Sequence, residues 1–247
     1  MDESIVTPQP EIRPGPAPWS DLFLYLFFGF GLFFAAGFGL RQLLTPGSIL
    51  SSALIYALNV LFFVGAVYVV GVRRGRLSWA SLGLSPARWE PRWLTLAVLV
   101  VVFFNPIRVL VAAGIQLILE GNLNSLVNSA RVQIFTPSGN IWVNFLVTLV
   151  LAGMAAPLAE ELFFRGALYT WFRSRFSATW AILASSVLFA LGHYDTLAVV
   201  VTSFILGAVN AWLFERYRSI WLPIAVHAVN NSLAVVLLYA TLLAGVK

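Results

Sequence analysis

Long apolar runs dominate this sequence, and most are long enough to cross a membrane as helices. Seven runs stand out, at residues 21–40, 48–72, 93–119, 141–156, 177–192, 196–214 and 220–244. About 20 apolar residues span the hydrocarbon core of a bilayer, where a chain segment must satisfy its backbone hydrogen bonds internally. The runs therefore predict an all-α fold, a polytopic transmembrane helix bundle with seven to eight spanning helices.

The count of crossings depends on an eighth segment, residues 158–172, which is apolar but carries Glu160, Glu161 and Arg165. Pro157 precedes it and is compatible with a new helix or with a kink in the preceding one. A separate crossing would reverse the side of every later loop. Residues 1–20, with five prolines and no apolar periodicity, predict a disordered tail before a single transmembrane domain at residues 21–247.

Composition excludes several classes of protein. Hydrophobic residues make up 60% of the chain and charged residues 10%, which predicts a multi-pass integral membrane protein. The absence of cysteine removes disulfides, thiolate metal sites and a cysteine nucleophile. The net charge of +5 does not indicate nucleic-acid binding, because the arginines are scattered singly or in short clusters between apolar runs.

Two connections between apolar runs are informative. The loop 73–92 contains five arginines and one glutamate, so we place it, and the N-terminus two crossings earlier, on the cytoplasmic side. The connection 121–140 has apolar residues on one helical face, which predicts an interfacial helix. No internal repeat is evident, which disfavours a transporter built from inverted halves.

Ionisable residues inside apolar runs are costly in a bilayer, so each is a candidate for function. Glu161 and Arg165 are four residues apart, in the acid-before-base order that stabilises a helix, whereas Glu160 lies about 100° round the helix axis. We therefore expect Glu161 to be the structural partner of Arg165 and Glu160 to be available for chemistry. The alternative is a pair of acids in the first turn of a helix at the water interface, where the helix dipole favours them.

His193, His227 and Asn231 are the other candidates. His193 ends an apolar run, where a polar loop residue is the simpler interpretation. His227 and Asn231 are one turn apart on one face of the last run, where they either point into a site or hold helices together. The similar depth of these residues in the predicted bundle favours a shared site. In an antiparallel hairpin turning near Phe176, Glu160 and His193 both lie about 24 Å from the tip, and the last run brings its pair to a similar depth.

In this order, the three motifs resemble those of the CPBP family of intramembrane proteases, which comprises the CAAX prenyl endopeptidases and their bacterial Abi/CAAX relatives. The motifs are Glu160-Glu161-x-x-x-Arg165, Phe189-x-x-x-His193 and His227-x-x-x-Asn231. The stretch 204–223 is also similar to the family's region between its histidine motifs. The resemblance covers about residues 141–232, where it implies the catalytic core of a multi-pass protein of a prokaryotic plasma membrane. The first 140 residues match only as hydrophobic spans.

The resemblance implies an intramembrane endopeptidase that hydrolyses a peptide bond of a membrane-embedded or lipid-anchored protein or peptide. Glu160, with His193, would hold and deprotonate the attacking water, while His227 and Asn231 would stabilise the oxyanion. The metal question stays open. Glu160, His193 and His227 could supply three ligands to a divalent metal such as zinc, but their spacing is no standard zinc signature. The family is often called a metalloprotease, although its residues also support a metal-free glutamate mechanism.

Two other classes are alternatives. A non-catalytic membrane scaffold or immunity protein could use the same fold to bind a partner, although the complete polar set argues against it. A transporter would find its best support in the Asn105-Pro106 kink and in Arg108, which otherwise snorkels, lines a pocket or binds a lipid phosphate. Other intramembrane proteases are disfavoured. The chain lacks His-Glu-x-x-His and Gly-x-Gly-Asp, and Gly83-Leu84-Ser85, its nearest serine motif, lies in the basic loop.

Overall fold

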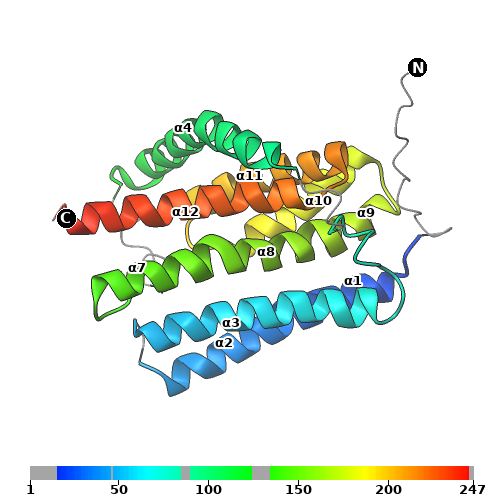
Figure 1. Cartoon of the computed structure of the whole chain (residues 1–247), viewed down its shortest axis with the longest axis horizontal. Helices are drawn as coiled ribbons and strands as arrows, with labels where there is room; N and C mark the ends of the chain where they lie inside the picture. The colour runs from blue at the N-terminus through cyan, green and yellow to red at the C-terminus, as the bar shows by residue number, and fades with distance from the viewer. Residues whose placement is uncertain (1–15, 46, 85–89, 124–133, 245–247) are drawn as a thin grey trace.

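The structure is a computed structural model that describes residues 16–45, 47–84, 90–123 and 134–244. In these residues the chain forms a bundle of long helices that run roughly along one axis (Figure 1). Six helical rods are long and apolar enough to cross a membrane, and a shorter apolar helix accompanies them. The prediction of an all-α, multi-pass membrane protein is therefore confirmed. The number of membrane-spanning helices in the described residues is close to seven.

Several rods alternate α-helical stretches with π-helical ones, which are labelled η. In chain order the elements are α1 (Trp19–Leu26), η1 (Phe27–Gly31), α2 (Leu32–Leu43), α3 (Ile49–Ala66), η2 (Val67–Val72), α4 (Arg92–Glu120), α7 (Ile141–Val150), η4 (Leu151–Ala155), α8 (Ala156–Glu161), η5 (Leu162–Tyr169), α9 (Thr170–Arg173), α10 (Ala178–Leu191), α11 (Leu197–Tyr217) and α12 (Trp221–Leu243).

Segment 158–172 does not cross the membrane as a separate helix. Elements α7, η4, α8, η5 and α9 form one continuous rod, Ile141–Arg173, which we call the central rod. Pro157 is the second residue of α8 and lies inside this rod, just after the π-helical stretch η4. Of the predicted tail, residues 1–15 lie outside the described part, and α1 already begins at Trp19. The predicted interfacial helix falls largely on residues 124–133, which are also outside it.

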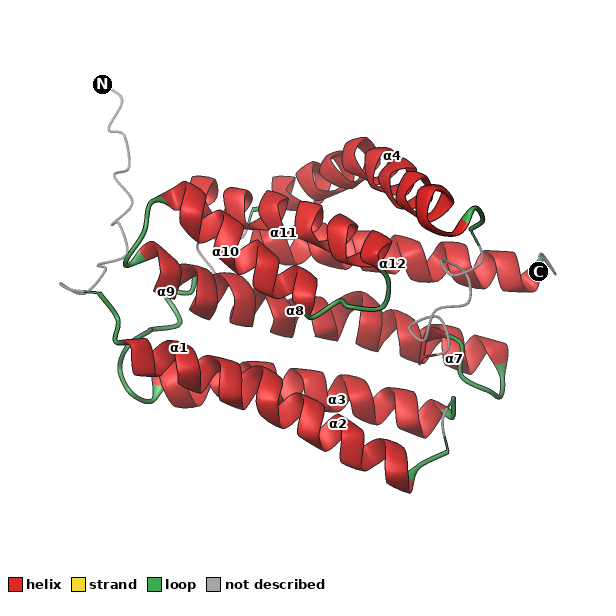
Figure 2. Cartoon of the chain, turned by 180° about the vertical axis from the view of Figure 1, so that it is seen from behind, coloured by secondary structure: helices red, strands yellow, loops and turns green. Residues whose placement is uncertain are grey.

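The central rod lies between the other helices of the bundle. Helix α3 packs along it, α12 packs against its η4 and α8 parts, and α10 packs against η5 and α9. Helix α2 packs on α3, α1 contacts η5 of the central rod, and α4 covers α11 and α12 (Figures 1 and 2). Residues near the middle of the central rod, including Glu160 and Glu161, are therefore within reach of several neighbouring helices.

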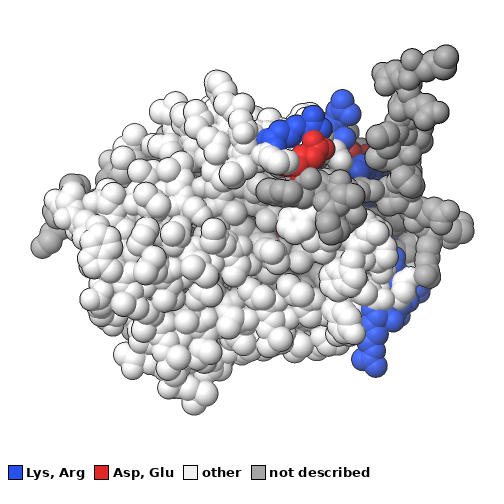
Figure 3. All heavy atoms as spheres, in the orientation of Figure 1, with Lys and Arg blue, Asp and Glu red and all other residues white. Residues whose placement is uncertain are grey.

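Charged side chains gather at one end of the bundle. Asp21 at the start of α1 pairs with Arg74 and Arg76 at 2.8 and 3.3 Å, and Glu215 of α11 pairs with Arg173 at 3.2 Å. On the face drawn in Figure 3, the charged side chains lie toward this end. We call it the Arg-rich end; it carries Arg73, Arg74, Arg76, Arg173, Arg175, Arg216 and Arg218. The basic loop and the ends of α9 and α11 thus share one side, as joining segment 158–172 to the preceding span requires.

Candidate active site

Glu160 lies in α8, inside the bundle, with 12% of its side chain exposed. Asn59 of α3 donates a hydrogen bond from Nδ2 to Glu160 Oε1 at 3.4 Å. The other oxygen, Oε2, lies 3.9 Å from His193 Nε2 and 3.8 Å from His227 Nε2. Two histidines from different parts of the chain therefore face one carboxylate in the interior.

His193 reaches Glu160 from the turn that follows α10. Carbonyl groups in the last turn of a helix have no intrahelical partner, and His193 Nδ1 lies 2.8 Å from the carbonyl oxygen of Phe189, four residues earlier. Because a carbonyl only accepts, Nδ1 carries the proton, and a neutral His193 presents an unprotonated Nε2 to Glu160. The antiparallel packing of α10 on the central rod brings the two residues to one depth, as the hairpin arithmetic predicts.

Glu161 belongs to a second, fully buried group of polar side chains. It accepts hydrogen bonds from His227 Nδ1 at 2.8 Å and Asn210 Nδ2 at 3.0 Å, and its other oxygen lies 3.0 Å from Arg165 Nε. Arg165 in turn donates to the carbonyl of Gly207 at 2.9 Å. The predicted Glu161–Arg165 pair is present. Glu161 also orients His227, a contact that the four-residue spacing to Arg165 does not reveal.

Asn231 contacts the central rod next to a proline. Pro157 has no N–H, so it cannot donate to the carbonyls of Ala152 or Gly153, the acceptors at i−5 and i−4. Side chains of α12 bind these carbonyls instead. Asn231 Nδ2 donates to Ala152 O at 3.2 Å, and Ser232 Oγ donates to Gly153 O at 3.4 Å. Neighbouring helices commonly satisfy freed backbone groups in this way in membranes, so Pro157 helps to fix where α12 meets the rod.

A cavity of about 470 Å³ adjoins Glu160, a volume typical of small-molecule and peptide side-chain pockets. Glu160, His193 and Asn231 line it. His227 does not, because its side chain is 1% exposed and lies between the two glutamates. Three of the four predicted site residues thus line one cavity. The fourth, His227, is buried outside the cavity and contacts Glu160 from the protein interior. Most of the remaining lining is aromatic or aliphatic and comes from η1, α2 and α3.

The three candidate metal ligands do not form a metal site as they are placed. Both histidines have the tautomer that suits a ligand, with Nδ1 hydrogen-bonded and Nε2 turned toward Glu160. However, among the described residues no group of three or more His, Cys, Asp or Glu side chains is arranged to hold a metal ion. We therefore derive no chemical step through a metal.

Three buried asparagines join this region without belonging to any motif. Asn59 contacts Glu160, Asn210 contacts Glu161, and Asn230 donates to Asn231 Oδ1 at 3.0 Å. Each is a polar residue inside an apolar run. Because burying such a group in lipid is costly, its position in the sequence alone could have identified it as a candidate site residue. The partner of each, which lies on another helix or in the next residue, cannot be read from spacing alone.

The fold and the site define a class of protein: a multi-pass membrane protein whose interior holds a glutamate faced by two histidines beside a cavity. Residues 142–233 match the family described as Rce1-like, type II CAAX prenyl endopeptidase. The match covers the central rod, α10, α11 and the part of α12 that carries His227 and Asn231. The resemblance to the CPBP family that the motifs indicate is therefore confirmed over this segment.

A named relative supports the same resemblance. The protein named "Putative membrane peptidase YdiL" from Bacillus subtilis (strain 168) is 27% identical over 89 residues, which make up 36% of this chain and 36% of the relative. The match thus spans about a third of the relative's length. No solved structure matches the chain.

Proposed function

We propose that this protein is an intramembrane endopeptidase in which Glu160 activates water for attack on a peptide bond. One observation supports this most directly: the Glu160 carboxylate lies beside a cavity and is faced by Nε2 of His193 and His227 at 3.9 and 3.8 Å. A carboxylate in such a place is suited to act as a general base. The family match over residues 142–233 supports proteolysis as the reaction.

In the proposed reaction, a water molecule lies between Glu160 and His193. The unprotonated Nε2 of His193 accepts one hydrogen bond from it and orients its lone pair toward the peptide carbonyl carbon. As the oxygen–carbon bond forms, Glu160 takes the second proton and the carbonyl oxygen becomes an oxyanion. Collapse of this intermediate breaks the carbon–nitrogen bond, and Glu160 returns the proton to the departing nitrogen. The products are a carboxylic acid and an amine.

His227 and Asn231 are the proposed donors to the oxyanion. Asn231 uses one amide hydrogen on the Ala152 carbonyl, and its second hydrogen is left for the oxyanion. Glu161 accepts a hydrogen bond from His227 Nδ1 and so holds the ring with Nε2 turned toward Glu160, where a proton on Nε2 would make it the second donor to the oxyanion. Donors held in place before the reaction stabilise a developing negative charge without a cost of reorganisation.

We also propose that substrate enters from the end of the bundle opposite the Arg-rich end. Phe30, Phe63 and Phe164 line the cavity on the Arg-rich side of Glu160, with ring centroids 5.7 to 5.8 Å apart. On the other side, the lining residues Phe38 and Tyr194 are 70% and 64% exposed. Because arginine-rich loops lie in the cytoplasm, the cavity would receive a membrane-embedded or lipid-anchored peptide from the opposite side. Its aromatic lining suits apolar side chains.

Cleavage of a peptide library by the purified, detergent-solubilised protein tests this function. We expect defined cleavage sites with wild type and with Glu120→Ala, which removes an exposed glutamate at the end of α4, and none with Glu160→Ala. Activity should persist in the presence of a chelator. A wild type that cleaves no membrane peptide would refute the proposal, and activity that the chelator abolishes would overturn its metal-free chemistry.

A further inference from the structure

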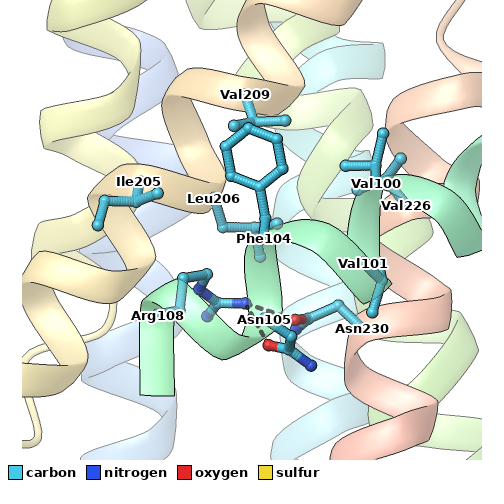
Figure 4. Close-up of a pocket in the computed structure, with 10 residues that line it drawn as sticks. All are labelled: Val100, Val101, Phe104, Asn105, Arg108, Ile205, Leu206, Val209, Val226 and Asn230. Carbon is cyan, nitrogen blue, oxygen red and sulfur yellow. Dashed lines mark hydrogen bonds between the residues drawn. The ribbon is translucent and has the colours of Figure 1, made fainter. Parts of the chain in front are cut away.

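Arg108 is a charged residue that the proposed mechanism does not use. It lies in the middle of α4, where its neighbour Ile107 is 52% exposed, yet its guanidinium turns into the bundle (Figure 4). Its Nε donates to the carbonyl of Thr202 at 3.1 Å, and its Nη1 donates to the side-chain oxygens of Asn105, at 3.5 Å, and Asn230. These partners are neutral oxygens. A cation held at this depth is costly, which makes a functional role the default hypothesis.

Contact with Arg108 determines which end of the Asn230 amide faces which neighbour. Arginine has only donors, so it selects the oxygen of Asn230. The Nδ2 group of Asn230 then points the other way and donates to Asn231 Oδ1 at 3.0 Å. Asn231 consequently turns its own nitrogen toward the Ala152 carbonyl, at 3.2 Å, on the side of the cavity that it lines. The two ends of an amide have nearly the same shape, so without such a neighbour they can exchange places.

We propose that Arg108 is a positioning residue, acting through Asn230 to make Asn231 present its N–H groups rather than its oxygen to the reaction centre. This inference rests on the proposed function, because the chain of hydrogen bonds ends at the proposed oxyanion donor. An oxygen in that position would repel the oxyanion. Because aligned hydrogen bonds polarise one another, the positive charge of Arg108 also strengthens the N–H groups of Asn231 as donors.

Asn230→Asp is the most discriminating variant. A carboxylate at this position pairs with Arg108, so we expect thermal stability no lower than that of wild type. It has no N–H to donate, however, so the Asn231 amide is drawn to turn its nitrogen toward the new carboxylate and its oxygen toward the cavity. Turnover should fall by on the order of 10- to 100-fold, with KM changed less than about twofold. A merely structural contact between Arg108 and Asn230 predicts unchanged turnover.

Variants of Arg108 test the other end of the chain. Arg108→Met removes the donor and should lower turnover by on the order of 10-fold. Arg108→Lys keeps a charged donor and should restore most of the loss, while Arg216→Met removes an exposed arginine at the Arg-rich end as the matched control. In an Asn231→Ala background, neither Arg108→Met nor Asn230→Asp should reduce turnover further, because the group through which they act is gone.

The side-chain amide signals of Asn231 give a readout that needs no protease activity. They can be assigned by ¹⁵N-asparagine labelling and the Asn231→Ala variant. We expect them to shift in Asn230→Asp and Arg108→Met and to stay near their wild-type positions in Arg108→Lys. Unmoved signals overturn the inference, and so does a turnover loss that is equally large in the Asn231→Ala background. A wild type without proteolysis refutes the proposed function instead, and the amide signals then decide the inference alone.

Discussion

Two adjacent glutamates differ sharply in their surroundings. Glu161 is fully buried and bound by His227, Asn210 and Arg165, whereas Glu160 lines the cavity. The 100° step between consecutive helical residues is enough to separate them, because one side of α8 faces α12 and the other faces α3 and the cavity. Adjacent residues of one type can therefore take a structural role and a proposed chemical role.

Glu161→Gln should mainly destabilise the protein. The substitution leaves the buried Arg165 without its charged partner, and breaking a buried pair in this way typically costs about 3–5 kcal/mol of unfolding free energy. Thermal unfolding and yield in detergent measure the effect, with Glu160→Gln as the neighbouring control that should fold like wild type. The roles are reversed if Glu160→Gln unfolds while Glu161→Gln folds normally and is inactive.

Asn231→Ala separates a protease from a non-catalytic scaffold. If its amide acts on the tetrahedral intermediate, turnover should fall by on the order of 100- to 1000-fold while substrate affinity changes little. A scaffold would instead lose partner binding or stability, because the amide would serve only a packing hydrogen bond. Cleavage rate and affinity should be measured on the same purified variant beside wild type. Unchanged cleavage would remove Asn231 from the site.

Single residues were predictable where helical geometry alone decides the contact. The Glu161–Arg165 pair follows from i,i+4 spacing, and the meeting of Glu160 with His193 follows from counting residues along a hairpin. The contact between His227 and Glu161 was not predictable, since it depends on how α12 rotates against the central rod. For the same reason the sequence allows three interpretations of Arg108, because only packing shows that its guanidinium turns inward.

At the scale of elements, the central rod depends on how helices tolerate Pro157. A proline inside an apolar run can end one helix or be absorbed by the neighbours, and the sequence allowed both. In the structure a π-helical stretch, η4, precedes it, and α12 side chains bind the carbonyls of Ala152 and Gly153. The number of membrane crossings cannot be decided from sequence, because the side chains that bind these carbonyls, Asn231 and Ser232, lie about 80 residues later in the chain.

Gly83 belongs to the basic loop and packs closely against the turn between α11 and α12. It has a φ of +76°, and an added Cβ would lie 2.8 Å from the backbone nitrogen of Ile220. The glycine of the apparent serine motif therefore has a packing role. Gly121, with a φ of +69° and no atom of the described residues within 4 Å of an added Cβ, is the matched control.

Gly83→Ala should therefore lower the melting temperature clearly more than Gly121→Ala. Both substitutions carry the cost of a left-handed backbone, about 1–2 kcal/mol, but only Gly83→Ala also forces the loop away from the α11–α12 turn. The two melting temperatures, measured in one detergent, check this. Equal decreases would show that the close approach to Ile220 contributes nothing.

At the scale of the whole molecule, the class of fold was predictable because lipid leaves few options to a chain with this pattern of apolar runs. The basic loop and the ends of α9 and α11 lie at one end of the bundle, and this follows once segment 158–172 is counted as part of the preceding span. The proposed path to the site is not predictable from sequence, since it depends on aromatic side chains from η1, α3 and η5 that meet only in the folded bundle.

The absence of cysteine makes the proposed side of entry directly measurable. Arg41→Cys places a thiol at the end of α2 that lines the cavity, and Arg216→Cys places one at the Arg-rich end. With a membrane-impermeant maleimide added to intact cells, we expect labelling of Arg41→Cys, and of Arg216→Cys only after permeabilisation. The reverse pattern would place the opening of the cavity on the cytoplasmic side.

Hydrolysis of an identified peptide in H₂¹⁸O by wild type and by Glu160→Gln, each verified as folded, tests whether Glu160 activates the attacking water. We expect wild type to place ¹⁸O in the new carboxylate. Glu160→Gln should lower turnover by on the order of 100- to 10,000-fold at similar KM, the usual contribution of a general base. A folded Glu160→Gln protein that cleaves the peptide at the wild-type rate would overturn this role of Glu160.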